Sequence, residues 1–325
     1  LPINFLEISE IWQHLFNKFL RFFIDRNLIS PGKPYYSKLD FLRMSQDLTL
    51  SLRYEGDETI YPDEDYREQL FYQDPRIIDL VREKKLSIHS IFSYCSSCIS
   101  ILHAKDLLET QDISLFQSFL DRLKERADDD VLAAKRIIGS KHFMLIDEMI
   151  KGSRPSDLVH PKIDEVISIL EREREKHANQ KAIIFTQYRE MAQKLKEILR
   201  ERFNGAIKAE KFIGQASKPD DRGFSQSKQI DIINAFRDGE INVLIATSVA
   251  EEGLDIPNVD AVIFYEPVPS EIRLIQRRGR TGRNSPGRCH VLMASGTVDV
   301  PFFRVACRKE EKMNKILSNA DEISL

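Results

Sequence analysis

The feature of this sequence that most constrains its fold is the alternation of short apolar runs with helical patterns after residue 157. The predicted strands cover residues 182–186, 208–213, 243–247, 261–265 and 289–294, and all but 208–213 are largely apolar. Predicted helices cover residues 161–177, 190–202, 228–236, 270–278 and 300–317. Strands that are apolar throughout are typical of a parallel sheet buried on both faces. We therefore predict an α/β domain at residues 158–325, a parallel sheet with helices on both faces and functional loops at the carboxyl ends of its strands.

Residues 1–157 show helical periodicity and almost no strand-like alternation, so they are predicted to form a mostly α-helical domain. The predicted helices cover residues 8–27, 37–53, 77–108, 114–125 and 131–150. Ser9 is the expected N-cap of the first helix. The aromatic residues around Trp12 recur at helical spacing, which favours core packing over a base-stacking platform.

Charge and cysteine usage narrow the class of protein. The net charge is −3, with 27 basic against 25 acidic side chains in residues 158–325 and 21 against 26 before them. Phosphate contacts must therefore come from local patches. Four cysteines without disulfide-framework spacing, and no apolar run of ~18 residues, indicate an intracellular, cytoplasmic protein without a membrane span, nucleoid-associated if the source is archaeal. The sequence starts at Leu1 rather than Met, so we expect it to begin inside a longer protein.

An arginine-rich block, Gln-Arg-Arg-Gly-Arg-Thr-Gly-Arg, occupies residues 276–283. Arg280 and Arg283 are three positions apart, so on a helix they would share a face. Guanidinium groups suit the oxygens of a transferring phosphoryl group, so this pair fits an arginine finger. The block alone leaves two alternatives open, a solvated basic helix end and a plain contact with a phosphate backbone.

Three blocks in order resemble motifs of superfamily 2 helicases. Residues 276–283 resemble motif VI, residues 247–255 resemble motif V, and residues 184–190 resemble motif IV. Further blocks at 212–217, 222–226 and 264–270 resemble the archaeal Hef branch, whose eukaryotic relative is FANCM. The resemblance implies that residues 158–325 form the second RecA-like lobe of a P-loop NTPase-type motor. It implies that residues 1–157 are a thumb-like helical domain inserted between two lobes.

The resemblance also implies roles for single residues. Arg280 and Arg283, with Gln276 beside them, would bind the γ-phosphate of ATP and act as the catalytic residues by stabilising charge in the transition state. Gly253 and Asp255 would lie near the nucleotide. The residues expected to contact the backbone of the tracked nucleic-acid strand are Thr186, Gln187, Gly214, Gln215 and Thr247.

Other motifs of ATP hydrolysis and of metal binding are not found in the sequence. No G-x-x-x-x-G-K-[ST] P-loop occurs, and Asp147-Glu148 does not continue as an acidic box of the DEAH type. ATP and Mg²⁺ would then be bound mainly by a first lobe outside this sequence, and the chain alone is not expected to hydrolyse ATP. No metal site is predicted, because Cys95 and Cys98 are interpreted as small buried side chains on a helix. Cys289 and Cys307 are expected in the core.

The leading hypothesis is therefore part of an ATP-dependent DNA helicase or translocase that acts on branched DNA, such as stalled forks and junctions, in replication repair. Its expected partners are branched DNA and the first lobe, with a nuclease domain and a sliding clamp as further candidates in the full-length protein. One alternative is a non-catalytic DNA-binding or scaffolding module with a vestigial motor lobe, and another is an RNA-directed superfamily 2 helicase. The helical domain would grip DNA through a basic face formed by Arg122, Lys124, Arg126, Lys135, Arg136 and Lys141.

Overall fold

The computed structural model describes residues 1–29, 32–33, 35–53, 86–154, 158–176, 180–215, 223–247, 256–268, 270 and 287–323. The chain divides into two compact units. The helical unit comprises Ile3–Leu108 and Phe116–Leu158, and the sheet unit comprises Leu1–Pro2, Glu109–Leu115 and Val159–Leu325. A single boundary near residue 157 therefore misses one feature, because the short segment Glu109–Leu115 belongs with the sheet.

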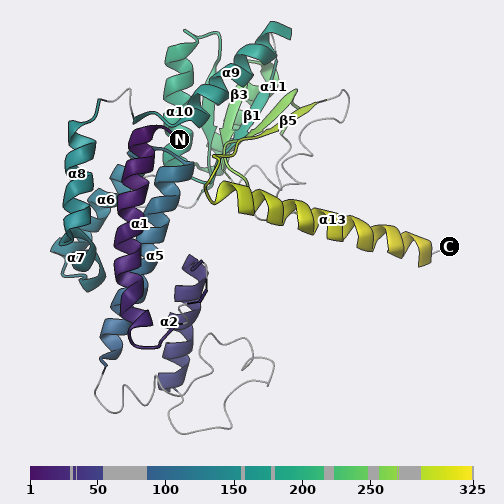
Figure 1. Ribbon diagram of the computed structural model, residues 1–325. Coiled ribbons are helices and arrows are strands. Elements are labelled where there is room, and N and C mark those ends of the chain that lie inside the picture. The colour runs from purple at the N-terminus through teal and green to yellow at the C-terminus, as the bar shows by residue number, and fades with distance from the viewer. Residues whose placement is uncertain are drawn as a thin grey trace. The chain divides into compact units, whose positions relative to one another are not determined.

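The described helices of the N-terminal part follow the predicted periodicity closely (Figure 1). Their bounds are α1 (Ile3–Ile24), α2 (Lys38–Arg53), α5 (Ile88–Thr110), α6 (Ile113–Asp128), α7 (Leu132–Ile138) and α8 (Lys141–Gly152). Two details of the prediction were wrong. Ser9 lies buried inside α1 and does not cap it. The helix expected over residues 131–150 is two helices, because the Ser140 hydroxyl accepts the N–H of Phe143 at 3.1 Å and begins α8.

The core of the helical unit is aromatic. Trp12 is fully buried, its ring meets Phe116 edge-on at 5.5 Å, and its indole N–H donates to the carbonyl of Ile101 at 2.6 Å. This confirms core packing as the role of Trp12. Cys95 and Cys98 are fully buried on α5 as predicted, and burial raises the pKa of the Cys95 thiol to about 12. Across the part of the chain that the structure describes, no three His, Cys, Asp or Glu side chains group as metal ligands.

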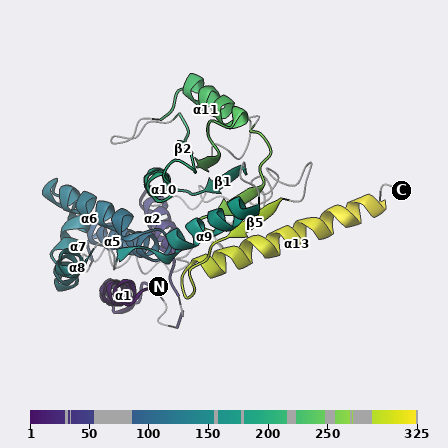
Figure 2. The ribbon, with the colours of Figure 1, turned by 90° about the horizontal axis from the view of Figure 1, so that it is seen from above.

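The sheet unit contains five parallel strands in the order β2-β3-β1-β4-β5, which confirms the predicted sheet (Figure 2). Their bounds are β1 (Ala182–Phe185), β2 (Ala209–Phe212), β3 (Val243–Ala246), β4 (Ala261–Phe264) and β5 (Arg288–Val291). Every residue of β1, β3 and β4 is buried, as strands covered on both faces require. β5 is less buried and exposes Cys289, and Cys307 is partly exposed, so the core positions expected for these cysteines were wrong.

Helices cover both faces of the sheet, with α11 on one face and α9 and α10 on the other (Figure 2). The helices of the unit are α9 (Pro161–Lys176), α10 (Arg189–Arg202), α11 (Gln226–Asp238) and α13 (Asp299–Ile323). One core cluster joins Phe185, Phe264 and alternate residues of the other strands to Phe236 of α11 and Ala306 of α13. The side chains that alternate with them, such as Ile184 and Ile245, are equally buried and point to the opposite face.

Candidate functional site

The parallel register brings the carboxyl ends of the strands to one level. Phe212 pairs with Ala246, Ala246 with Phe185, and Phe185 with Phe264. The ladder continues one residue further, because the Thr186 N–H donates to Ala246 O at 3.0 Å and the Thr247 N–H donates to Phe212 O at 3.1 Å. The five residues expected to contact a nucleic-acid strand therefore follow three neighbouring strands, β2, β3 and β1, at the same edge of the sheet. We call this the carboxyl edge.

The turn after β2 is closed by a tight backbone contact. The carbonyl of Gly214 accepts the N–H of Phe224 at 3.1 Å and the guanidinium of Arg189 at 3.3 Å. A Cβ on Gly223 would lie 2.1 Å from the carbonyl oxygen of Gln215, so only glycine fits there. Gln215 is exposed beside this contact. The close approach that Gly223 permits, together with the Phe224 N–H bond, thus holds the backbone of Gly214 and Gln215, which is predicted to contact the strand.

The turn after β1 is held by a carboxylate. Glu266, which follows β4, is 2% exposed and accepts the backbone N–H of Gln187 at 2.5 Å and the hydroxyl of Thr186 at 3.3 Å. Thr186 is fully buried, whereas Gln187 is exposed. In this turn, the side chain of Gln187 is therefore exposed to solvent, whereas the Thr186 hydroxyl is buried and hydrogen-bonded to Glu266. Direct strand contacts by Thr186 and by the largely buried Thr247 stay predictions.

Next to this carboxylate lies a buried ion pair. The ammonium group of Lys162 meets Asp299 at 2.5 Å and donates to the carbonyl of Thr110 at 2.9 Å. Burial lowers the pKa of Lys162, although the nearby Asp299 acts to raise it. Burial raises the pKa of Asp299, although the nearby Lys162 acts to lower it. Desolvation thus opposes both charges, and each depends on the other to remain ionised.

A buried histidine joins the segment Glu109–Leu115 to the start of α9. The ring of His160 donates from Nε2 to the carbonyl of Glu109 at 3.0 Å and accepts the N–H of Lys162 at Nδ1 at 3.2 Å. Its own backbone N–H donates to Asp112, which also pairs with Lys194. Burial lowers the pKa of His160 to about 4, so the neutral ring is the form that fits these partners.

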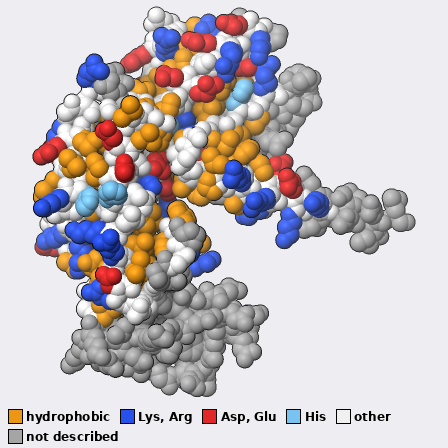
Figure 3. Space-filling view, in the orientation of Figure 1, with side chains coloured by type: hydrophobic (Ala, Val, Ile, Leu, Met, Phe, Trp, Pro, Cys, Tyr) orange, Lys and Arg blue, Asp and Glu red, His pale blue; other side chains and the backbone are white. Residues whose placement is uncertain are grey.

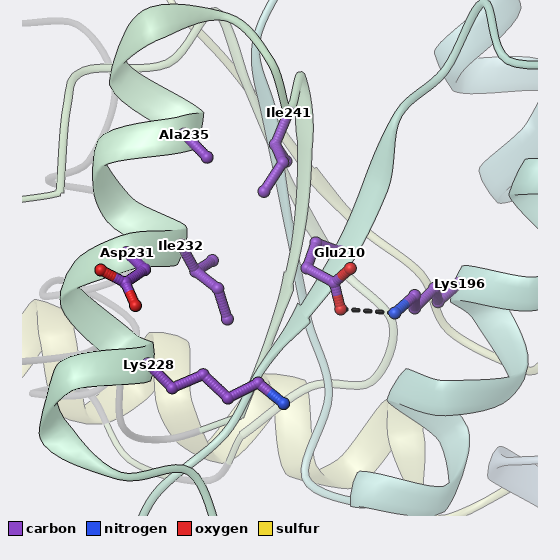
Figure 4. A pocket seen from close by; sticks show the side chains of 7 residues that line it. All are labelled: Lys196, Glu210, Lys228, Asp231, Ile232, Ala235 and Ile241. Carbon is purple, nitrogen blue, oxygen red and sulfur yellow. Dashed lines mark hydrogen bonds and ion pairs between the residues drawn. The ribbon is translucent and has the colours of Figure 1, made fainter.

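An open groove of about 400 Å³ lies beside β2, the edge strand of the sheet, between α10 and α11 (Figure 4). Two lysines and two carboxylates line it, and Lys196 pairs with Glu210 at 2.5 Å. Lys228 extends over the ring of Phe224 at 3.9 Å from its centroid. Because the lining charges balance, this groove offers no net attraction for phosphate. The Lys196–Glu210 pair instead ties α10 to β2.

The basic residues expected to grip DNA in the helical unit are partly neutralised. Lys124 pairs with Asp121 and Asp147, Lys135 pairs with Asp130, and Arg136 donates to Ser93. Figure 3 shows both basic and acidic side chains on the viewed face of this unit, with some Lys and Arg side chains gathered beside the histidines. A continuous basic face built from these residues therefore stays a prediction, with Arg126 and Lys141 exposed among the candidates.

The residues expected to bind nucleotide fall outside the described part of the chain. This holds for Gly253 and Asp255, for Gln276, and for Arg280 and Arg283. The predicted helix at 270–278 lies there almost entirely as well. Their roles stay predictions.

Two residues that the sequence did not single out, Glu266 and Gly223, shape the carboxyl edge. Both lie inside blocks that carried the family resemblance, but the resemblance assigned them no role. An acidic residue directly after a buried strand was a usable signal for Glu266, because functional groups gather at strand ends. The contact made by Gly223 depends on a loop closure that spacing along the sequence does not show.

Comparisons with known proteins now place the chain in a family. The helicase conserved C-terminal domain matches residues 161–285. The structure resembles the crystal structure of the Pyrococcus furiosus Hef helicase domain, with a TM-score of 0.67 and 34% sequence identity over 93% of this chain and 55% of that one. Within the described residues, no helix combines the length and apolar character needed to cross a membrane.

Curated relatives agree with this match. A provisionally named ATP-dependent RNA helicase of Methanocaldococcus jannaschii is 41% identical over 71% of this chain and 28% of its own length. The ATP-dependent DNA helicase mph1 of Neurospora crassa is 31% identical over 72% of this chain and 20% of its own. A Fanconi anemia group M protein homolog of Mus musculus is 28% identical over 70% of this chain and 13% of its own. The chain thus spans less than a third of these relatives, and it belongs to the Hef/FANCM branch of the superfamily 2 helicases, of which it carries the C-terminal RecA-like lobe.

Proposed function

We propose that this chain forms the second motor lobe and the adjoining helical domain of an ATP-dependent DNA helicase or translocase that acts on branched DNA. The observation that carries the proposal is the carboxyl edge, where β1, β2 and β3 end side by side in register. Exposed Gln187 and Gln215 and the backbone of Gly214 are polar groups without a fixed charge. Such groups suit a strand that is held by its backbone and moved regardless of base sequence.

In the proposed mechanism, the nucleotide lies between this lobe and a first lobe that carries a P-loop. Arg280 and Arg283 would reach the γ-phosphate, and Gln276, Gly253 and Asp255 would complete this side of the site. Magnesium is assigned to the first lobe, since this sequence contains neither a P-loop nor an acidic box of the DEAH type. Because each lobe supplies part of the nucleotide site, ATP hydrolysis requires both lobes together.

DNA is favoured as the substrate by the names of the relatives, because those of Neurospora crassa and Schizosaccharomyces pombe are named as DNA helicases. RNA is the second candidate, because the 41% identical relative is named as an RNA helicase. Backbone contacts separate the two only where a 2′-hydroxyl is touched.

The test is the ATPase rate of the protein that joins this chain to a P-loop lobe. We expect forked DNA to stimulate hydrolysis more than linear duplex DNA or duplex RNA. The Arg283→Ala variant should lose about 10³-fold or more of the stimulated rate, as expected for an arginine finger. Stronger stimulation by duplex RNA would reassign the substrate, and stimulation that survives in Arg283→Ala would reject the arginine finger.

A further inference from the structure

Glu266 contacts both the β1 turn and the segment Glu109–Leu115. Besides Thr186 and Gln187, it accepts the side-chain amide of Gln111 at 3.2 Å. We propose that Glu266 is a positioning residue that fixes Gln187 for contact with the nucleic-acid strand and makes that contact responsive to Gln111. The strand contact itself rests on the proposed function.

The first step of the argument is the burial of the group. Glu266 is 2% exposed, and a carboxylate removed from water is stable only where donors surround it. The structure supplies three donors, namely the Gln187 N–H, the Thr186 hydroxyl and the Gln111 amide. The buried ammonium group of Lys162 pairs with Asp299 at 2.5 Å and also interacts electrostatically with Glu266. These three neutral donors are therefore among the groups that Glu266 holds, and they help to keep Glu266 in place.

The second step concerns the β1 turn. The strand ladder ends with the N–H of Thr186, so the N–H of Gln187 has no partner in the sheet. Glu266 takes that N–H at 2.5 Å and thereby fixes the direction in which the exposed Gln187 side chain leaves the turn. A hydrogen bond from a backbone N–H to a carboxylate is stronger than one to a neutral acceptor.

The third step concerns the segment Glu109–Leu115. Two consecutive residues after β4 hold it, because the Tyr265 hydroxyl donates to the carbonyl of Gln111 at 2.7 Å while Glu266 accepts the side chain of the same residue. Gln111 is 1% exposed, so water cannot replace these partners. A displacement of Gln111 would remove one of the donors to Glu266 and loosen the Gln187 turn. The nucleic-acid contact would then depend on the position of this segment.

The test compares Glu266→Ala, Glu266→Gln and Gln187→Ala in the 325-residue chain. The matched control is Glu173→Ala, which removes another buried glutamate of the sheet unit, one that binds Arg288 and Gln180 at the amino ends of the strands. Two readouts are used. Amide hydrogen exchange at Gln187, followed by NMR, reports whether the turn is held, and anisotropy of fluorescein-labelled single-stranded DNA at fixed salt reports the strand contact.

We expect Glu266→Ala to speed exchange at Gln187 by at least 10-fold and to weaken DNA binding by about 10-fold, as much as Gln187→Ala does. Glu266→Gln should restore both readouts to within about 3-fold, because its amide oxygen can still accept the Gln187 N–H. Glu173→Ala should lower stability without changing either readout.

Unchanged exchange at Gln187 in Glu266→Ala would overturn the proposal whatever the DNA result. Equal losses of affinity in Glu173→Ala and Glu266→Ala would also overturn it, because they would reflect stability alone. If Gln187→Ala binds DNA like the unmodified chain, the strand site of the proposed function fails, and the exchange readout still decides whether Glu266 holds the turn.

Discussion

The helical unit and the sheet unit bury different kinds of side chain. In the helical unit the largest fully buried residues are aromatic, Trp12, Phe5 and Phe23 among them. The sheet unit has an aromatic core as well, but next to its carboxyl edge it also buries Lys162, Asp299 and Glu266. Dispersion contacts need only a good fit, whereas buried charges need specific partners. These buried charges lie next to the carboxyl edge, where the candidate site is. Buried charges gathered at one place are expected of a functional site rather than of a hydrophobic core.

The largest expected effect comes from separating the buried ion pair of the sheet unit. Asp299→Ala removes the partner of Lys162 and an acceptor for the N–H of Ala294, so we expect the free energy of unfolding to fall by about 3–5 kcal/mol. Urea unfolding followed by circular dichroism measures the loss. Trp12, the only tryptophan, reports the helical unit separately through its fluorescence.

A double variant shows whether the loss of stability comes from an unpaired buried charge or from lost packing. Lys162→Met with Asp299→Asn removes both charges and keeps similar volumes, so it should be more stable than Lys162→Met alone. If the double variant is instead less stable by the sum of the two single losses, the two side chains act independently. The contrast between a charged edge and an aromatic core would then lose its energetic basis.

The next largest expected effect is a loss of folding stability at low pH, which we expect in both units. Burial is the main cause that lowers the pKa of His160 in the sheet unit, and that of His103 in the helical unit, to about 4. Both folded values lie below the unfolded value of about 6.5, so unfolding takes up protons between these limits. Stability from each histidine is complete above pH 6.5 and is lost as the pH falls toward 4, by up to about 3 kcal/mol for fully buried His160.

Replacing one histidine at a time shows how much of the pH dependence of stability comes from each unit. His160→Gln should flatten the pH dependence of sheet-unit stability between pH 6.5 and 4, and His103→Gln should do the same for the transition seen by Trp12 fluorescence. A slope that is unchanged in His160→Gln would show that the ring is not kept neutral by burial.

Hydrophobic periodicity was enough to predict the sheet, because strands such as β1 and β4 are apolar at every position and admit few other structures. It does not reveal contacts that tertiary structure decides. Thr186 belongs to a motif expected to contact a strand, and that contact stays a prediction, but no sequence pattern shows that its hydroxyl donates to Glu266. The segment Glu109–Leu115 continues a helical pattern but packs with the sheet. Its polar side chains find partners dozens of positions away, and no local spacing encodes such pairs.

The smallest expected effect on stability comes from replacing one glycine in each unit by alanine. Gly223→Ala would place a Cβ 2.1 Å from the carbonyl oxygen of Gln215, so the turn at Gly214 must shift. We expect a loss of about 1–3 kcal/mol in stability and weaker binding of single-stranded DNA. Gly152→Ala at the end of α8 meets nothing within 4 Å and should be neutral or stabilising by up to about 1 kcal/mol. Thermal unfolding and DNA anisotropy of both variants check the pair. Because only Gly223 lies at the carboxyl edge, equal DNA affinity in the two variants would mean that the Gly214 turn makes no contact with the strand.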